Sequence, residues 1–215
     1  MSFFKKKDKI DFITLPAPDN TTLYFQQIKI LSEQYWSVNQ PNENIYGFQI
    51  QQNTIWKPGL SDADLLRFQN IIGFVFPEPL KNFYKVMNGL SKPGINLYGN
   101  DGTTPTFSPV FYSYPQDINS IKELIKWFLE ANLISKNEML QLKVSRIFPI
   151  CWHRFLLIDI PGNPILSMFG DDVIYCADNL SKLLANELFE NIYNVHDFEN
   201  LKDLKPDIKF WLDQR

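Results

Sequence analysis

Cys151 and His153 are the residues of this chain whose types and spacing could form a reactive pair. Alternate residues of a strand share a face, so a thiol and an imidazole at these positions could act as nucleophile and base. The imidazole would need an orienting carboxylate, and Asp159 is the obvious candidate near in sequence. Six residues of unbroken strand would separate Asp159 from His153 by roughly 20 Å. Catalysis by this pair is therefore one hypothesis, and a buried structural thiol beside a strand histidine is the favoured alternative.

A metal site has less support. The second histidine, His196, stands beside Asp197 and Glu199. Two histidines without a regular spacing do not make a zinc site, and an acidic face in water is the simpler interpretation. No metal is predicted.

The acidic turns do not indicate a cation or a nucleotide. Asp101 lies between Gly99 and Gly102, and Asp171 and Asp172 follow Gly170. These turns lack the ligand ladder of a calcium loop, and the first lacks the lysine and the strand-to-helix setting of a phosphate-binding loop. The aspartates are expected to form turns, and no cofactor and no catalytic residue is predicted.

Composition narrows the class of protein. The chain has 215 residues, of which 45% are apolar and 15% aromatic, and this is enough for one main domain with a full core. A net charge of −3 lacks the positive field that nucleic-acid binding requires. Cys151 and Cys176 are too few for a disulfide scaffold, and the basic N-terminus offers neither a signal peptide nor a membrane span. We expect a cytoplasmic protein with reduced thiols and without membrane or nucleic-acid partners.

Apolar periodicity predicts the elements that must position these residues. Residues 1–20 are expected to form an extended or flexible arm, and 21–215 a single domain. Helices and strands are grouped along the chain, which is typical of an α+β fold with a mainly antiparallel sheet and helices packed on it. The sheet is predicted to end in a C-terminal meander. Helices are expected from 22 to before 41, at 61–72 and 79–87, and from 117, 135 and 180, with a last one around 208–211; strands are expected at 46–50, 95–98, 154–160, 165–169 and 173–177.

The helical hairpin between Trp56 and Gly89 is the most specific local pattern. Ser61 followed by Asp64 is a capping box for its first helix. Pro79 suits the first turn of the second helix. Asn88-Gly89 tolerates a left-handed conformation and predicts the C-terminal cap of that helix.

The order of these residues resembles the SUKH superfamily, which includes bacterial toxin-immunity proteins and a fungal regulator of cell-wall assembly. The resemblance covers about 56–190. Phe148-Pro149-Ile150 is similar to the family's entry into its central sheet, and 159–165 is similar to the hairpin that follows. The residues assigned to the family framework are Trp56, Gly59, Ser61, Pro77, Asn88 and Gly89.

The resemblance implies a binding protein that neutralises a toxin effector by direct occlusion, without chemistry of its own. Aromatic anchors ringed by polar groups are typical of protein interfaces, and acidic residues steer basic partners. The alternative for these rings is that they cover the sheet. The predicted contact residues are Asp101, Phe107, Phe111, Tyr112, Tyr114, Asp171 and Asp172.

Two rival functions remain open. One is an intracellular scaffold or regulatory interaction protein, as the fungal relative implies. The other is a hydrolase or transferase that uses Cys151 and His153. A toxin partner would distinguish the immunity function from the scaffold, and a reactive Cys151 would favour the enzyme.

Overall fold

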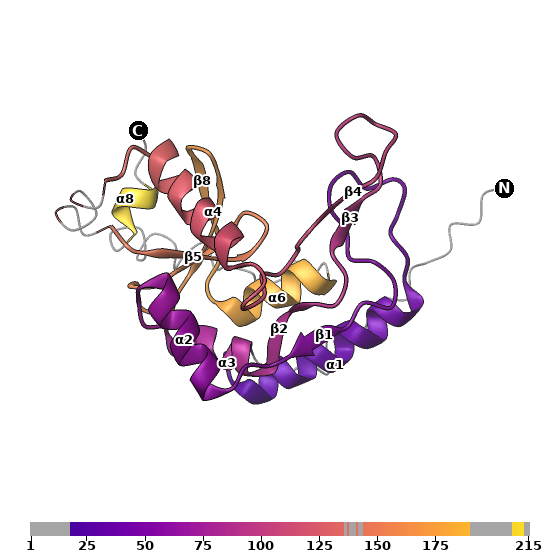
Figure 1. Ribbon diagram of the computed structural model, residues 1–215, viewed down its shortest axis with the longest axis horizontal. Coiled ribbons are helices and arrows are strands. Elements are labelled where there is room, and N and C mark those ends of the chain that lie inside the picture. Colours follow the sequence, from indigo (N-terminus) through magenta and orange to yellow (C-terminus); the bar gives the residue numbers. More distant parts are fainter. Residues whose placement is uncertain (1–17, 136, 138–140, 142–143, 190–207, 213–215) are drawn as a thin grey trace.

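The α+β class is confirmed by the computed structural model of the chain, which describes residues 18–135, 137, 141, 144–189 and 208–212 (Figure 1). The strands pair antiparallel in two small sheets and one larger sheet. The helices are α1 (Thr22–Val38), α2 (Asp62–Ile72), α3 (Glu78–Val86), α4 (Ile118–Ala131), α6 (Leu180–Phe189) and α8 (Lys209–Leu212), and the strands are β1 (Trp56–Pro58), β2 (Met87–Leu90), β3 (Gly94–Asn96), β4 (Thr106–Ser108), β5 (Ile147–Cys151), β6 (Arg154–Leu157), β7 (Ile165–Phe169) and β8 (Asp172–Ala177).

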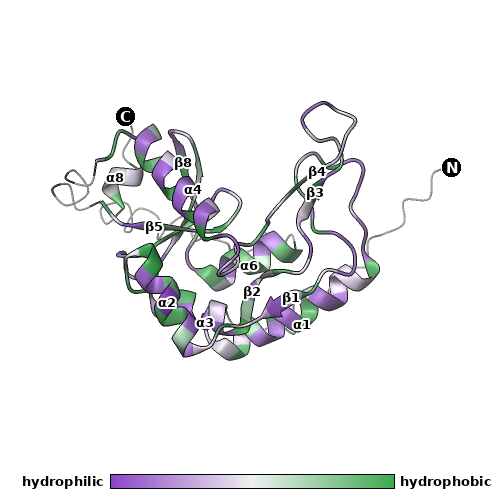
Figure 2. Ribbon diagram, viewed as in Figure 1, coloured by the Kyte–Doolittle hydropathy of each residue, from purple (hydrophilic) through white to green (hydrophobic). Residues whose placement is uncertain are grey.

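The four-stranded sheet is the predicted C-terminal meander, in the order β5-β6-β7-β8. Both faces of β5, β6 and β7 are buried, so adjacent residues of these strands enter different cores. Leu156 of β6 belongs to a core shared with α1, α3 and α6, whereas Phe155 and Leu157 belong to a second core shared with α4 and α8. The sheet therefore lies between two helical layers, and in Figure 2 α4 shows alternating green and purple, as expected for a helix that covers one face.

The N-terminal helix α1 is part of the main core. Thr21 caps it by accepting a hydrogen bond from Tyr24 N at 3.2 Å. Phe25 and Ile28 are fully buried, and the ring of Phe25 meets that of Phe83 of α3 at 5.9 Å. The domain thus includes elements before Trp56, where the family resemblance begins.

The start of the helical hairpin agrees with the sequence analysis. Ser61 is the N-cap of α2 and accepts a hydrogen bond from Asp64 N at 3.1 Å. Pro77 is the N-cap of α3, and Pro79 lies in its first turn. Gly59 lies so close to α3 that an added Cβ would stand 1.9 Å from Lys85 O, so only glycine fits there.

The end of the hairpin differs from the prediction. Helix α3 ends at Val86, and Asn88-Gly89 lies inside β2 instead of capping the helix. The Asn88 side chain accepts a hydrogen bond from Tyr114 N at 2.8 Å and donates one to Tyr114 O at 2.7 Å. This long-range pairing explains the strand, although Gly89 does have the predicted positive φ, at +75°.

Several other predictions have a different outcome. The segment 46–50 forms no strand, and its contact with the sheet is an isolated bridge between Gln49 and Ile95. Asn20, the last residue of the predicted arm, is bound to the domain, because Ser181 N donates to its Oδ1 at 2.9 Å. Residues 1–17, most of the helix expected from 135, and His196 with its acidic neighbours lie outside the described residues.

Candidate functional site: a protruding aromatic hairpin

The hairpin of β3 and β4 stands away from the rest of the domain in Figure 1. Its strands pair antiparallel, with Ile95 opposite Phe107, and the bridge from Gln49 to Ile95 adds the loop after α1 to its edge. Side chains directly opposite each other in such a pair share a face. The hairpin and residues 42–49 therefore form one projection, which we call the aromatic hairpin.

Local hydrogen bonds fix the tip of the aromatic hairpin. Asp101 Oδ1 accepts hydrogen bonds from Thr103 N at 2.9 Å and from Thr104 N at 2.8 Å. These bonds lower the pKa of Asp101 to about 2, so its exposed carboxylate is charged at neutral pH. Gly99 has φ +56°, and a Cβ there would stand 1.9 Å from Thr104 O. The predicted turn-forming role of Asp101 agrees with this geometry.

Four aromatic rings belong to the aromatic hairpin, those of Tyr46, Phe48, Tyr98 and Phe107. Phe107, a predicted contact residue, is 57% exposed. Tyr46 is 82% exposed and stacks on Tyr98 with ring centroids 4.8 Å apart, while the Tyr98 hydroxyl donates to Glu43 O. The sequence analysis missed Tyr46 and Tyr98 as contact residues, and an isolated tyrosine in each of two polar segments was the signal that could have found them.

Two of the predicted contact residues are in the core instead. Phe111 is 2% exposed and Tyr114 is 9% exposed. The ring of Phe111 meets that of Trp56 at 4.8 Å, and the ring of Tyr114 meets that of Phe68 at 4.8 Å. Tyr112 is half-buried, and its hydroxyl donates to Trp152 O at 3.4 Å. After β4 the chain turns into the domain. Phe111 and Tyr114 are therefore core residues and not exposed contact residues.

The structure does not bring the other predicted acidic residues to this projection. Asp171 and Asp172 are exposed at the turn between β7 and β8. That turn is held against the end of α4, where Asn132 Nδ2 donates to Gly170 O at 3.1 Å. In Figure 1 this end of α4 and the aromatic hairpin lie on opposite sides of the molecule. The seven predicted contact residues therefore do not form one surface.

Cys151 and His153 do not form the predicted pair on one strand face. β5 ends at Cys151 and β6 begins at Arg154, so His153 lies in the turn between them together with Trp152, which has φ +43°. Cys151 is fully buried, and this burial raises the pKa of its thiol well above the usual value. Burial also lowers the pKa of His153. A protonated thiol is a poor nucleophile, so this geometry does not favour the Cys-His enzyme.

The carboxylate considered for that pair is engaged elsewhere. Asp159 forms an ion pair with Arg146, with its Oδ2 2.9 Å from Arg146 Nε. The guanidinium holds the pKa of Asp159 below its usual range, mainly through its side-chain hydrogen bonds. Asp159 is therefore a structural partner of Arg146.

We expect Cys151 in the folded protein to resist a mild thiol reagent at pH 7.5. Both its burial and its raised pKa oppose formation of the thiolate. The measurement is the rate of thiol labelling in a Cys176→Ala variant, in native buffer and in denaturant. Denaturant should accelerate labelling by orders of magnitude. Fast native labelling that His153→Ala abolishes would instead support the Cys-His enzyme.

A metal site and a membrane-spanning helix are both absent from the described residues. Within them, no group of three or more histidine, cysteine, aspartate or glutamate side chains could hold a metal ion. No helix in the described ranges is long and apolar enough to cross a membrane.

Comparison with known proteins identifies no relative. Protein-family models, curated proteins and solved structures were each compared with the chain, and none of the three gave a significant match.

Proposed function

We propose that this protein is a non-catalytic binding protein of the immunity type, which neutralises a cognate toxin effector by direct binding. The observation that carries the proposal is the aromatic hairpin, which exposes the rings of Tyr46 and Phe107 and whose tip is fixed by local hydrogen bonds. Large rigid aromatic side chains lose little conformational entropy on binding and are common anchors of protein interfaces. The order of framework residues in the sequence, which resembles the SUKH superfamily, supplies the immunity interpretation.

The charge of the aromatic hairpin favours a basic partner. Residues 42–49 and 94–108 contain the carboxylates of Glu43 and Asp101 and neither lysine nor arginine. A surface of one sign attracts the opposite sign and accelerates encounter at low salt. A toxin domain with basic surface residues fits this surface, and two carboxylates give a modest salt dependence.

The test is capture of the partner by the tagged protein from its native cells, followed by binding measurements with the purified partner. A double variant, Tyr46→Ser with Phe107→Ser, removes the two most exposed rings of the aromatic hairpin. Loss of an anchor residue typically costs about 2 kcal/mol, so each substitution should weaken binding roughly 30-fold. Phe169→Ser is the matched control, because Phe169 is 74% exposed at the distant β7–β8 turn.

The proposal requires one stoichiometric partner whose toxicity the wild-type protein and the control variant suppress and the double variant does not. Equal suppression by all three proteins would place the binding surface elsewhere. Capture of several signalling or envelope proteins in place of one toxin would support the scaffold function and contradict the immunity function. Thermal unfolding of each variant verifies that the substitutions leave the fold intact.

A further inference from the structure

A groove of about 750 Å³ lies between the C-terminal end of α2, one face of α4 and the start of β5. In Figure 1 these elements are on the side of the molecule away from the aromatic hairpin. The volume is within the usual range of small-molecule pockets, and most of the lining is apolar. The apolar side chains that line the groove are Ile72, Phe74, Ile125, Leu129, Ile134 and Ile147.

Helix α4 supplies one wall of the groove as a regular stripe. Lys122, Ile125, Lys126 and Leu129 line it. Residues three and four apart lie on one face of a helix, so these four side chains follow each other along α4. Lys122 is at the N-terminal end of the stripe, and Leu129 is two turns later, about 10 Å along the helix axis.

The opposite wall is held in place without a ligand. Arg146 pairs with Asp159, and its guanidinium lies 5.2 Å from the centre of the Phe74 ring. Gln69 of α2 holds the turn that carries Phe74, because its Oε1 accepts a hydrogen bond from Phe76 N at 2.8 Å. A wall that is fixed in this way loses little conformational entropy when a ligand binds.

The charges that line the groove do not balance. Lys126 pairs with Glu130 at 3.9 Å. Arg146 is balanced by Asp159. Lys122 forms no ion pair and no side-chain hydrogen bond with the residues that the structure describes. These pairings leave one uncompensated positive charge among the described lining residues, at the end of the stripe on α4.

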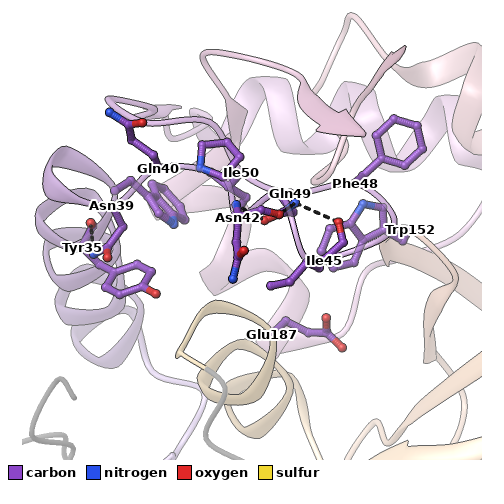
Figure 3. A pocket seen from close by; sticks show the side chains of 12 residues that line it. Tyr35, Asn39, Gln40, Asn42, Ile45, Phe48, Gln49, Ile50, Trp152 and Glu187 are labelled. Carbon is purple, nitrogen blue, oxygen red and sulfur yellow. Dashed lines mark hydrogen bonds between the residues drawn. The ribbon is translucent and has the colours of Figure 1, made fainter. Parts of the chain in front are cut away.

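The cavity drawn in Figure 3 offers no such charge. It measures about 200 Å³ and lies between Tyr35 of α1, the loop after α1, and Glu187 of α6. The Glu187 carboxylate accepts a hydrogen bond from Arg154 Nε at 2.7 Å. The charged group of that cavity is therefore already paired, whereas the groove beside α4 has a cation that a ligand can pair.

The lining of the groove selects a class of ligand. A sugar or a nucleotide base would lose hydrogen bonds to water against the apolar side chains and would gain few in return. A cationic amphiphile would be repelled by Lys122, and a dianion would keep an unbalanced charge. A ligand with a long apolar part and a single negative charge matches both the apolar lining and the one free cation.

We propose that this groove binds one medium-chain carboxylate, that is, the anion of a fatty acid. The carboxylate pairs with Lys122, and the acyl chain runs along α4 past Ile125 to Leu129. Burial of each methylene against the apolar side chains supplies affinity, and the lysine fixes the direction of the chain. The site is separate from the proposed toxin surface, because no lining residue belongs to the aromatic hairpin.

The test is isothermal titration calorimetry of the full chain at pH 8 and low salt with octanoate, decanoate and dodecanoate, each below the concentration at which it forms micelles. We expect saturable binding of one molecule per chain, with a dissociation constant of roughly 0.1 mM for decanoate. Each added pair of buried methylenes should tighten binding about tenfold. Decylammonium has the same chain with the opposite charge and should show no saturable binding.

Variants locate the ligand in the groove. Lys122→Gln should weaken decanoate binding about fivefold, as expected for one exposed charge pair. Lys85→Gln is its control, since it removes the same charge from an exposed position of α3 outside the groove. Leu129→Gln places a polar group of similar size in the wall and should weaken binding about tenfold, whereas Leu133→Gln, at a residue that is 82% exposed just after α4, should not.

The outcomes separate this proposal from its alternatives. Equal decanoate affinity of the wild type and Lys122→Gln would overturn it, as would equal affinity for octanoate and dodecanoate or tight binding of decylammonium. Sedimentation with phosphatidylglycerol vesicles without saturable binding of soluble decanoate would identify a membrane surface instead and also overturn it. If Leu129→Gln does not fold, Lys122→Gln and the chain-length series still decide the matter. The double variant Tyr46→Ser with Phe107→Ser should bind decanoate like the wild type, so failure of one proposal leaves the other intact.

Discussion

Replacement of Trp56 by alanine is expected to lower the free energy of unfolding by about 3–5 kcal/mol, the usual cost of deleting a large buried ring. Trp56 is 2% exposed and is the largest fully buried side chain among the described residues. Its ring contacts Trp36 of α1 at 5.7 Å, Phe83 of α3 at 6.0 Å and Phe111 at 4.8 Å. One side chain therefore joins three segments that are distant in sequence.

A polar contact adds to the expected cost. Trp56 Nε1 donates to the buried hydroxyl of Ser32 at 2.8 Å, and the substitution removes this bond. The alanine variant leaves Ser32 with one partner fewer in a dry environment. Trp56→Phe keeps most of the ring but not the N–H, so it should fall between the wild type and the alanine variant.

Chemical denaturation monitored by circular dichroism measures the change in the free energy of unfolding. In a thermal unfolding experiment, the melting temperature of a domain of this size should fall by roughly 10 °C. Trp127→Ala is the matched control, because Trp127 is 46% exposed on α4 and its loss should cost much less. If the two alanine variants were equally stable, Trp56 would not have the central packing role assigned to it.

Local sequence chemistry predicted the elements of this fold where the decisive contacts are local. The Ser61 cap needs only Asp64, three residues away, and the β6–β7 and β7–β8 turns were recognised from their own glycines, prolines and polar residues. Apolar periodicity placed α1, α4 and α6 for the same reason, since a helix is specified by neighbours along the chain.

The prediction at Asn88-Gly89 was wrong because a distant partner decides its structure. An asparagine followed by a glycine of positive φ suits a helix cap and also suits an irregular strand. The hydrogen bonds between Asn88 and the backbone of Tyr114 select the strand, and the two residues are 26 positions apart. No local pattern contains that information.

The candidate site was predicted in part. Asp101 and Phe107 are exposed on the aromatic hairpin as expected, whereas Phe111 and Tyr114 are buried. Residue type does not distinguish an interface ring from a core ring, because both positions favour large aromatic side chains. The path of the chain after β4 makes that distinction, and this path depends on contacts with Trp56 and Phe68.

Gly89→Val is expected to lower the free energy of unfolding by about 3 kcal/mol or more. Two costs add at this position. A valine at φ +75° pays backbone strain of about 1–3 kcal/mol. Its Cβ would also stand 2.6 Å from Ser113 Cβ and 3.1 Å from Phe111 O. Ser113 and Phe111 are both buried, so neither can move away without disturbing its neighbours.

Gly102→Val separates these two costs, because Gly102 has φ +80° and its added Cβ would meet no atom within 4 Å. Both variants pay the strain of a valine at positive φ, so the difference between their free energies of unfolding measures the contact with Ser113. The contact also has a local readout: Ser113 Oγ accepts from Lys57 Nζ at 3.1 Å and donates to Asp117 at the start of α4, so a displaced Ser113 should loosen the N-terminal turn of that helix. Faster amide hydrogen exchange there in Gly89→Val than in Gly102→Val is the expected result. If the two variants lost equal stability, strain alone would explain the glycine, and the close approach of β2 to Ser113 would have no energetic importance.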